Sequence, residues 1–217
     1  MDPMTAAITA PLIEPARHLI EVADRLGAIE AVKRKLVKQP DPAAAQLVTV
    51  LEELSKIYSA MESELATYLA FFFDSSDAQQ LARDRAALAR LESGAIQARM
   101  SEARARCGKI WNIYNRYLTP WFDRVLDGAE RKQLFGLFRE LSEIDSQMVD
   151  ALNSLATWLA AKAKLTTDLV EVGDLTKANA YVLAAIREVR PLRKRVTDAM
   201  VQIRELEGEF IEISGAI

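Results

Sequence analysis

The chain has 217 residues and a net charge of −3, and half of its residues are hydrophobic while 27% are charged, which is typical of a globular protein rather than a disordered one. A slightly acidic chain offers no general electrostatic attraction for nucleic acid, so we do not expect a nucleic-acid partner. A single cysteine cannot form an internal disulfide and the uncharged stretches are too short to span a membrane, so we expect a soluble, cytoplasmic protein.

The apolar residues repeat with a helical period along the chain, and the alternation typical of strands is absent. The few glycines and prolines divide the chain into long helices, which we predict over 13–38, 42–73, 78–118, 129–172 and 174–213, with a short helical turn at 120–126. Their unbroken 3-4 spacing predicts knobs-into-holes packing, and the short loops predict antiparallel neighbours. The expected fold is one all-α domain over 1–217, an elongated antiparallel up-down bundle of four to five long helices with coiled-coil-like packing.

The first and the last predicted helix carry opposite charges at their carboxyl ends. The first ends in basic residues and the last in acidic ones. In an up-down bundle of five helices these two run in the same direction, so we expect the two ends to meet and attract each other. The residues concerned are Lys33, Arg34, Lys35 and Lys38 on the first helix, and Glu205, Glu207, Glu209 and Glu212 on the last.

The second helix ends in three consecutive phenylalanines, Phe71, Phe72 and Phe73. Successive side chains on a helix point about 100° apart, so one packing stripe cannot bury all three. Burial by two neighbouring helices is the plainer interpretation. Alternatively, the rings insert into a membrane interface or a partner, which makes them candidates for membrane binding.

The third helix leads into an aromatic turn, KIWNIYNRYLTPWFDRVL, at 109–126. Its helical seam reads Ile96, Met100, Ala103, Cys107, Ile110, Tyr114 and Tyr117, so we expect Cys107 in the core. We expect Pro120 to end this helix, with Thr119 as the N-cap of the short turn. A structural corner is the favoured interpretation, and a binding site is the alternative. For that site the partner-binding candidates are Trp111, Tyr114, Arg116, Trp121, Phe122 and Arg124.

The last two helices each contain a residue that interrupts their pattern. Asp145 breaks the seam of the fourth helix, where it either fixes the register or, as we favour, gives way to Ile144 for one turn. Pro191 lies inside the fifth helix and predicts a kink. The same helix carries candidates for binding phosphate or anionic lipid, although a solvated face paired with acids is the plainer reading. They are Arg187, Arg190 and Lys194.

The sequence contains no set of residues for catalysis. His18 is the only histidine and Cys107 the only cysteine, too few for a zinc or di-iron centre or for a nucleophilic triad with its own base. The glycines are scattered singly, so no phosphate-binding loop is present. We expect no enzyme activity, no metal and no cofactor.

We therefore expect a non-enzymatic scaffold or regulatory module that acts through protein–protein contacts. Its partner is a protein of unknown identity, and the heptads of the last helix also allow homo-oligomers. The alternative is a membrane-perturbing or membrane-surface-binding bundle, in which the phenylalanine tip and the basic residues of the last helix meet anionic lipid.

Overall fold

The computed structural model describes residues 21–38, 42–74 and 95–215. Within these ranges all regular structure is helical and no strand occurs, so the fold class is all-α as the periodicity predicts. The named elements are α3 (Gly27–Lys38), α4 (Ala43–Asp74), α7 (Ala95–Ile113), η1 (Tyr114–Leu118), α8 (Thr119–Val125), α9 (Gly128–Glu171) and α10 (Leu175–Gly215).

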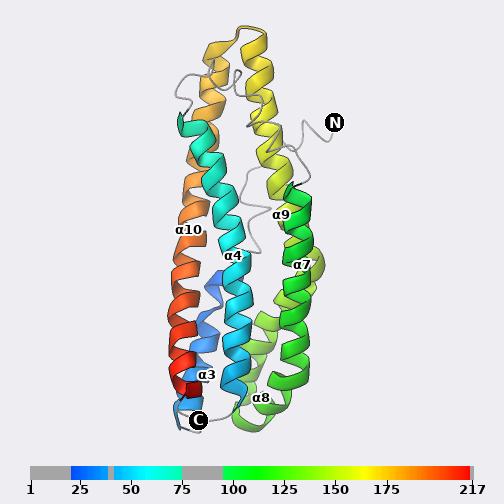
Figure 1. Cartoon of the computed structure of the whole chain (residues 1–217), viewed down its shortest axis with the longest axis vertical. Helices are drawn as coiled ribbons and strands as arrows, with labels where there is room; N and C mark the ends of the chain where they lie inside the picture. Colours follow the sequence, from blue (N-terminus) through cyan, green and yellow to red (C-terminus); the bar gives the residue numbers. More distant parts are fainter. Residues whose placement is uncertain (1–20, 39–41, 75–94, 216–217) are drawn as a thin grey trace.

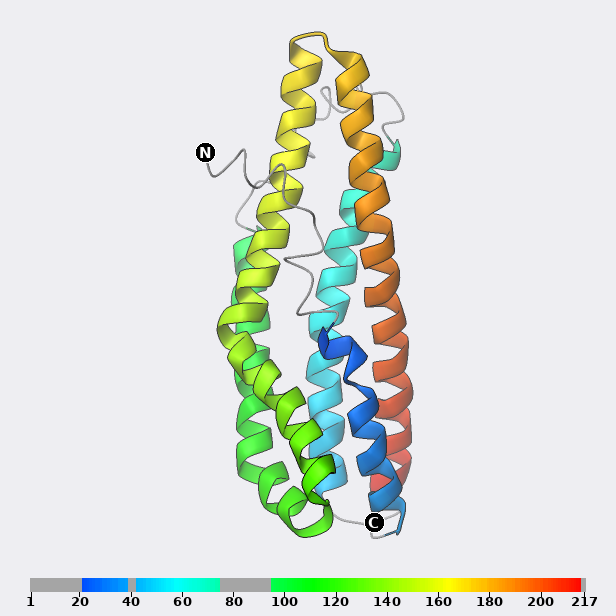
Figure 2. The same ribbon diagram turned by 180° about the vertical axis from the view of Figure 1, so that it is seen from behind.

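The long helices lie side by side along the long axis of the molecule (Figure 1). α10 packs most extensively against α4, and α7 packs most extensively against α9. α9 and α10 run in opposite directions on either side of a tight turn (Figure 2). Gly173 in that turn has a φ of 81°, a backbone conformation that glycine adopts without steric cost.

The core follows the seams that the sequence predicts on α4 and α10. On α4 the predicted seam is buried as far as its side chains are described, namely at Leu47, Leu51, Leu54, Tyr58, Met61 and Leu65. On α10 it is buried over eight helical turns, at Val182, Ala185, Val189, Leu192, Val196, Ala199, Ile203, Leu206 and Phe210. These two seams form the central part of the hydrophobic core.

The first helix differs from the prediction in its described part. A single helix over 13–38 was expected, but the chain turns at Arg25 and Leu26 before α3 begins at Gly27. Arg25 and Leu26 donate their backbone N–H groups three residues back rather than four, to Val22 and Ala23. This tighter winding coincides with Gly27, whose low helix propensity weakens the segment.

The predicted attraction between the ends of the first and last helices is confirmed. Lys33 on α3 forms an ion pair with Glu209 on α10, and the two helices are in contact. Lys35 also reaches Glu130 at the start of α9, at 3.4 Å. Basic side chains of α3 therefore join it to two other helices at this end of the molecule.

Several expectations concern residues outside the described part of the structure. His18 lies before it, and the side chains of Phe71, Phe72, Phe73 and Asp145 also lie outside the described part. The described helices include none that is long and apolar enough to cross a membrane. Pro191 lies within α10, which runs through it without interruption.

Candidate partner-binding groove at the aromatic corner

The aromatic turn is built on a short π-helix rather than on a helix break. α7 passes at Ile113 into η1, in which the backbone N–H of Thr119 donates five residues back, to the carbonyl of Tyr114. The hydroxyl of Thr119 donates to the same carbonyl at 3.1 Å. Pro120 has no N–H and its ring would crowd the carbonyl four residues earlier. A wider turn just before it relieves that clash, which accounts for the position of η1.

The π-helix corrects two predictions about this stretch. Thr119 is not an N-cap, because its backbone is helical and its side chain bonds backward. Tyr117 was expected in the core, yet it is 50% exposed, whereas its neighbour Leu118 is fully buried. The wide turn contains one extra residue, so the side chains are shifted by one position relative to the buried seam of the helix. Tyr117 therefore leaves the seam and Leu118 enters it.

The chain reverses direction directly after α8. Leu126 has an extended backbone, and Asp127 caps the start of α9. The Asp127 carboxylate accepts from the backbone N–H groups of Ala129 and Glu130, each at 2.9 Å, while Glu130 accepts from the N–H of Asp127. This reciprocal capping fixes the direction in which α9 leaves the corner.

Six rings from four consecutive elements form what we call the aromatic cluster: Trp111, Tyr114, Trp121, Phe122, Phe135 and Phe138. Tyr114 lies at its centre. It stacks on Phe138 with ring centroids 4.4 Å apart and on Trp111 at 5.5 Å. Offset stacking of this kind adds about 0.5–1.5 kcal/mol per pair beyond the area buried. The cluster therefore ties α7 and α8 to the first turns of α9.

A groove opens beside this cluster, between α8 and the beginning of α9. Its volume is about 410 Å³, within the range of small ligand or side-chain sites. The buried rings of Tyr114 and Phe122 form its aromatic side, and Phe135 contributes a ring that is 48% exposed. The remaining lining residues are Thr119, Asp123, Gly128, Arg131 and Lys132.

The polar groups of the groove are mainly cationic. Arg131 reaches the carboxylate of Asp123 at 3.5 Å, a loose and exposed pair, while Lys132 is exposed and adds a second positive charge. Burial raises the pKa of the Tyr114 hydroxyl; the Thr119 side chain opposes this rise and the Asp123 carboxylate adds to it. Tyr114 is therefore a neutral group at physiological pH, and the groove carries one net positive charge.

The structure divides the six partner-binding candidates of this stretch into three groups. Tyr114 and Phe122 line the groove. Trp111 and Trp121 do not line the groove but pack against two of its rings, the partly buried Trp111 against Tyr114 and the buried Trp121 against Phe122. Arg116 and Arg124 are exposed but lie outside the lining.

The cations of the groove come instead from α9, and neither they nor Phe135 are among the candidates predicted from the sequence. Arg131, Lys132 and Phe135 lie on the first two turns of α9, facing α8 across the reversal. The short connection at 126–127 is the feature of the sequence that points to these three residues. A reversal of that length places the start of α9 beside the helix before it.

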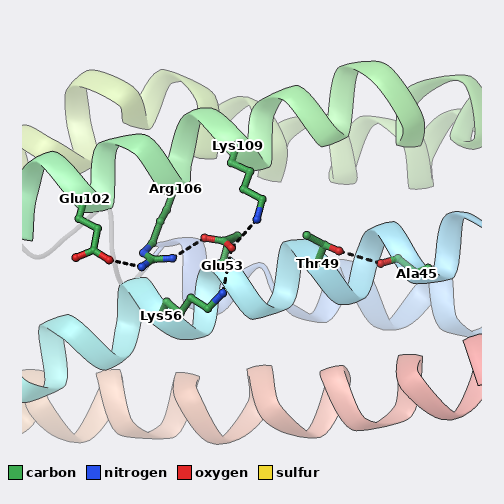
Figure 3. A network of polar contacts seen from close by, with 7 residues as sticks. All are labelled: Ala45, Thr49, Glu53, Lys56, Glu102, Arg106 and Lys109. Carbon is green, nitrogen blue, oxygen red and sulfur yellow. Dashed lines mark hydrogen bonds and ion pairs between the residues drawn. The ribbon is translucent and has the colours of Figure 1, made fainter.

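A second polar site, unforeseen in the sequence, lies between α4 and α7. Glu53 on α4 is only 3% exposed. Its carboxylate accepts from Arg106 at 2.8 Å, Lys109 at 2.9 Å and Lys56 at 3.1 Å (Figure 3). Burial alone would raise the pKa of Glu53, but the hydrogen bonds from Lys109, Arg106 and Lys56 outweigh it and hold the pKa at about 2.

The arginine of this network is shared with a second acid. Arg106 also pairs with Glu102 one turn earlier on α7, and the two carboxylates raise its pKa even though burial opposes this. Two of the three cations around Glu53 come from α7. The network therefore fixes how α7 lies along α4, and we assign it a structural role.

A buried lysine marks the contact between α9 and α10. Lys162 is 7% exposed, and its ammonium group lies 5.1 Å from the ring centroid of Trp158 and 5.5 Å from that of Tyr181. Burial lowers the pKa of Lys162, and the nearby Glu188 opposes this. Two ring faces thus compensate part of the cost of burying a cation.

The anion-binding candidates on α10 are exposed. Arg187, Arg190 and Lys194 all lie on the surface, and Lys194 pairs with Asp198 one turn later at 2.7 Å.

In the described ranges no three or more histidine, cysteine, aspartate or glutamate side chains are grouped so that they could hold a metal ion. Cys107 is buried.

Comparison of the chain with models of protein families, with curated proteins and with solved structures finds no match in any of the three.

Proposed function

We propose that this protein is a non-enzymatic helical scaffold or regulatory module that binds a partner protein through the groove at the aromatic corner. The observation that carries the proposal is the groove itself, with an aromatic side, an exposed phenylalanine and two cations around one 410 Å³ space. Exposed aromatic rings beside arginine are the composition of the energetically dominant part of protein interfaces.

The chemistry of the groove suggests the kind of segment it accepts. The apolar rings favour one large apolar or aromatic side chain as an anchor. The cations Arg131 and Lys132 favour an acidic residue next to that anchor, because opposite charges steer encounter and fix register. The partner is accordingly a peptide segment with an apolar anchor and an acidic flank.

An antiparallel up-down bundle with coiled-coil-like packing is part of this proposal. It is supported by the buried 3-4 seams of α4 and α10 and by the tight turn between α9 and α10. Such a bundle supplies a rigid frame, so that the groove is formed before the partner arrives and little ordering cost remains. A cytoplasmic location agrees with the lone, buried cysteine.

The test is selection of peptides from a random library on the immobilised protein, followed by affinity measurement on the best sequences. We expect them to share an apolar anchor with an acidic neighbour. Phe135→Ser and Lys132→Glu should each weaken binding about tenfold or more, as expected for an interface anchor and its charged neighbour.

The matched control is Tyr117→Ser, because this ring is as exposed as Phe135 and belongs to the same corner but does not line the groove. It should bind the selected peptides like the unmodified protein. Peptides that bind Phe135→Ser with undiminished affinity would contradict the proposed site. A selection without any shared anchor would count against the function.

A further inference from the structure

The outward face of α10 carries a charge pattern that reverses along the helix. α10 lies at the side of the molecule in both views (Figures 1 and 2). Its outer residues follow the 3-4 spacing on the side opposite the buried seam. In the N-terminal half the exposed charges on this face are Arg187, Arg190 and Lys194, and in the C-terminal half they are Asp198, Arg204, Glu205 and Glu212.

Exposed apolar side chains lie on the same face. Leu183 is 54% exposed, and Val201 and Ile211 are each 50% exposed. Large apolar residues on the outside of a helix are unremarkable one at a time. Here all three belong to the stripe that also holds the basic residues, while the acids flank it. The face thus combines apolar positions with charges of opposite sign at its two ends.

We propose that two copies of this chain associate through this face, with their α10 helices antiparallel about a two-fold axis. An antiparallel copy places the basic half of one helix on the acidic half of the other. With the axis near residues 199 and 200, Arg187 lies opposite Glu212 and Lys194 lies opposite Glu205, each pair occurring twice. Val201 then lies beside its own copy near the axis.

A second copy fits this face better than other occupants do. An acidic partner or an anionic membrane would suit Arg187, Arg190 and Lys194 but would be repelled by Glu205 and Glu212. The existing pair of Lys194 with Asp198 joins two side chains that are 75% and 61% exposed, so it is a weak competitor. Because the apolar area is small, the dimer is weak and its association depends on salt.

The experiment is sedimentation equilibrium of the full chain over a range of concentrations at low and high salt. We expect a monomer–dimer equilibrium that shifts toward monomer at high salt. Arg187→Glu with Lys194→Glu makes all four contact positions of the face acidic, and Glu205→Lys with Glu212→Lys makes all four basic. Each variant alone should be monomeric at concentrations where the unmodified chain dimerises.

Mixing the two variants is the decisive measurement, because it also shows that both are folded. The equimolar mixture should form heterodimers at least as tightly as the unmodified chain forms homodimers, since all four contacts become complementary. Arg116→Glu with Arg124→Glu changes the same charge elsewhere on the surface and should leave the dimer intact. A mixture that stays monomeric would overturn the proposal.

Cysteine cross-linking tests the orientation. Two Val201→Cys copies are roughly 5 Å apart along the helix direction, whereas two Leu183→Cys copies are about 50 Å apart at 1.5 Å per residue. Oxidation should therefore link Val201→Cys dimers only, and equal linking at both positions would overturn the antiparallel arrangement. A chain that is monomeric at every concentration but binds anionic vesicles through Arg187 and Lys194 would replace the dimer with a membrane surface.

Discussion

Glu53 shows how one buried carboxylate can hold two helices in register. The side chain is almost completely buried, and an ionised carboxylate in such a position is costly unless it is paired and hydrogen-bonded. Lys109, Arg106 and Lys56 provide that pairing from two helices. Removal of the charge would leave these cations facing a neutral group.

The first prediction follows from the pKa of Glu53, which is held at about 2 against an ordinary 4.5. The folded state binds this proton more weakly than the unfolded state does. The ionised Glu53 therefore makes its full contribution to the free energy of unfolding above about pH 5. This contribution is lost as the pH falls toward the pKa of Glu53 in the folded state. We expect Glu53→Gln to lower the free energy of unfolding at neutral pH by about 2 kcal/mol.

Urea unfolding at several pH values measures this effect. The difference between the unmodified chain and Glu53→Gln should shrink as the solution becomes acidic, because the carboxylate becomes protonated there. Glu102→Gln is the control, since Glu102 belongs to the same network but is 61% exposed, and it should cost less than about 1 kcal/mol. A constant difference across the pH range would refute the role assigned to Glu53.

The two prolines inside the helical region act differently because they lie at different positions in their elements. Pro120 lies in the first turn of α8, directly after the wider turn of η1, which already accommodates its ring and its missing N–H. Pro191 lies in the interior of α10, where it removes a hydrogen bond to the carbonyl of Arg187 and crowds it. A proline in a helix interior costs about 3 kcal/mol relative to alanine.

The second prediction is that Pro191→Ala stabilises the protein. Pro191 is exposed, so no packing is lost and a backbone hydrogen bond is regained. Removal of proline also increases the conformational freedom of the unfolded chain, and this offsets about 0.4–1 kcal/mol of the stabilisation. We expect a net gain of about 1–2 kcal/mol by thermal or urea unfolding. Pro120→Ala should change stability by less than about 0.5 kcal/mol, and an equal gain at both positions would contradict this explanation.

The long elements could be predicted from the sequence, whereas the corner could be predicted only in part. The seams of α4 and α10 follow directly from the spacing of apolar residues, because packing of one helical face selects them. The exposure of Tyr117 and the burial of Leu118 could not be read in this way. They depend on one extra residue in the turn of η1, and periodic patterns contain no sign of such an insertion.

The groove and the Glu53 network depend on contacts between helices, and this limited their prediction. Tyr114 and Phe122 were identified from the aromatic stretch itself, but Phe135 and Lys132 enter the groove from another helix. Glu53 looks like an ordinary surface acid in the sequence. Its burial follows from the position of α7, which the periodicity of α4 alone does not specify.

At the scale of the whole molecule, α3 and α10, the first and last described helices, are joined by an ion pair. It lies at the end of the molecule where the C-terminal ends of both helices are found (Figure 1). The sequence predicts this contact because connectivity makes the two helices run the same way and their ends carry opposite charges. The contact therefore reports on how the first and the last described helices lie relative to each other. Its energetic coupling can be measured without any assumption about function.

The third prediction is that Lys33→Glu and Glu209→Lys are each destabilising and that their combination restores most of the loss. The two side chains are 27% and 41% exposed, so we expect a coupling of about 0.5–1 kcal/mol that declines at high salt. A double-mutant cycle by urea unfolding measures it. Strict additivity of the two changes at low salt would mean that the ends do not interact in solution. Recovery of stability in the double variant, in contrast, would show that α3 and α10 attract each other through the charges at positions 33 and 209.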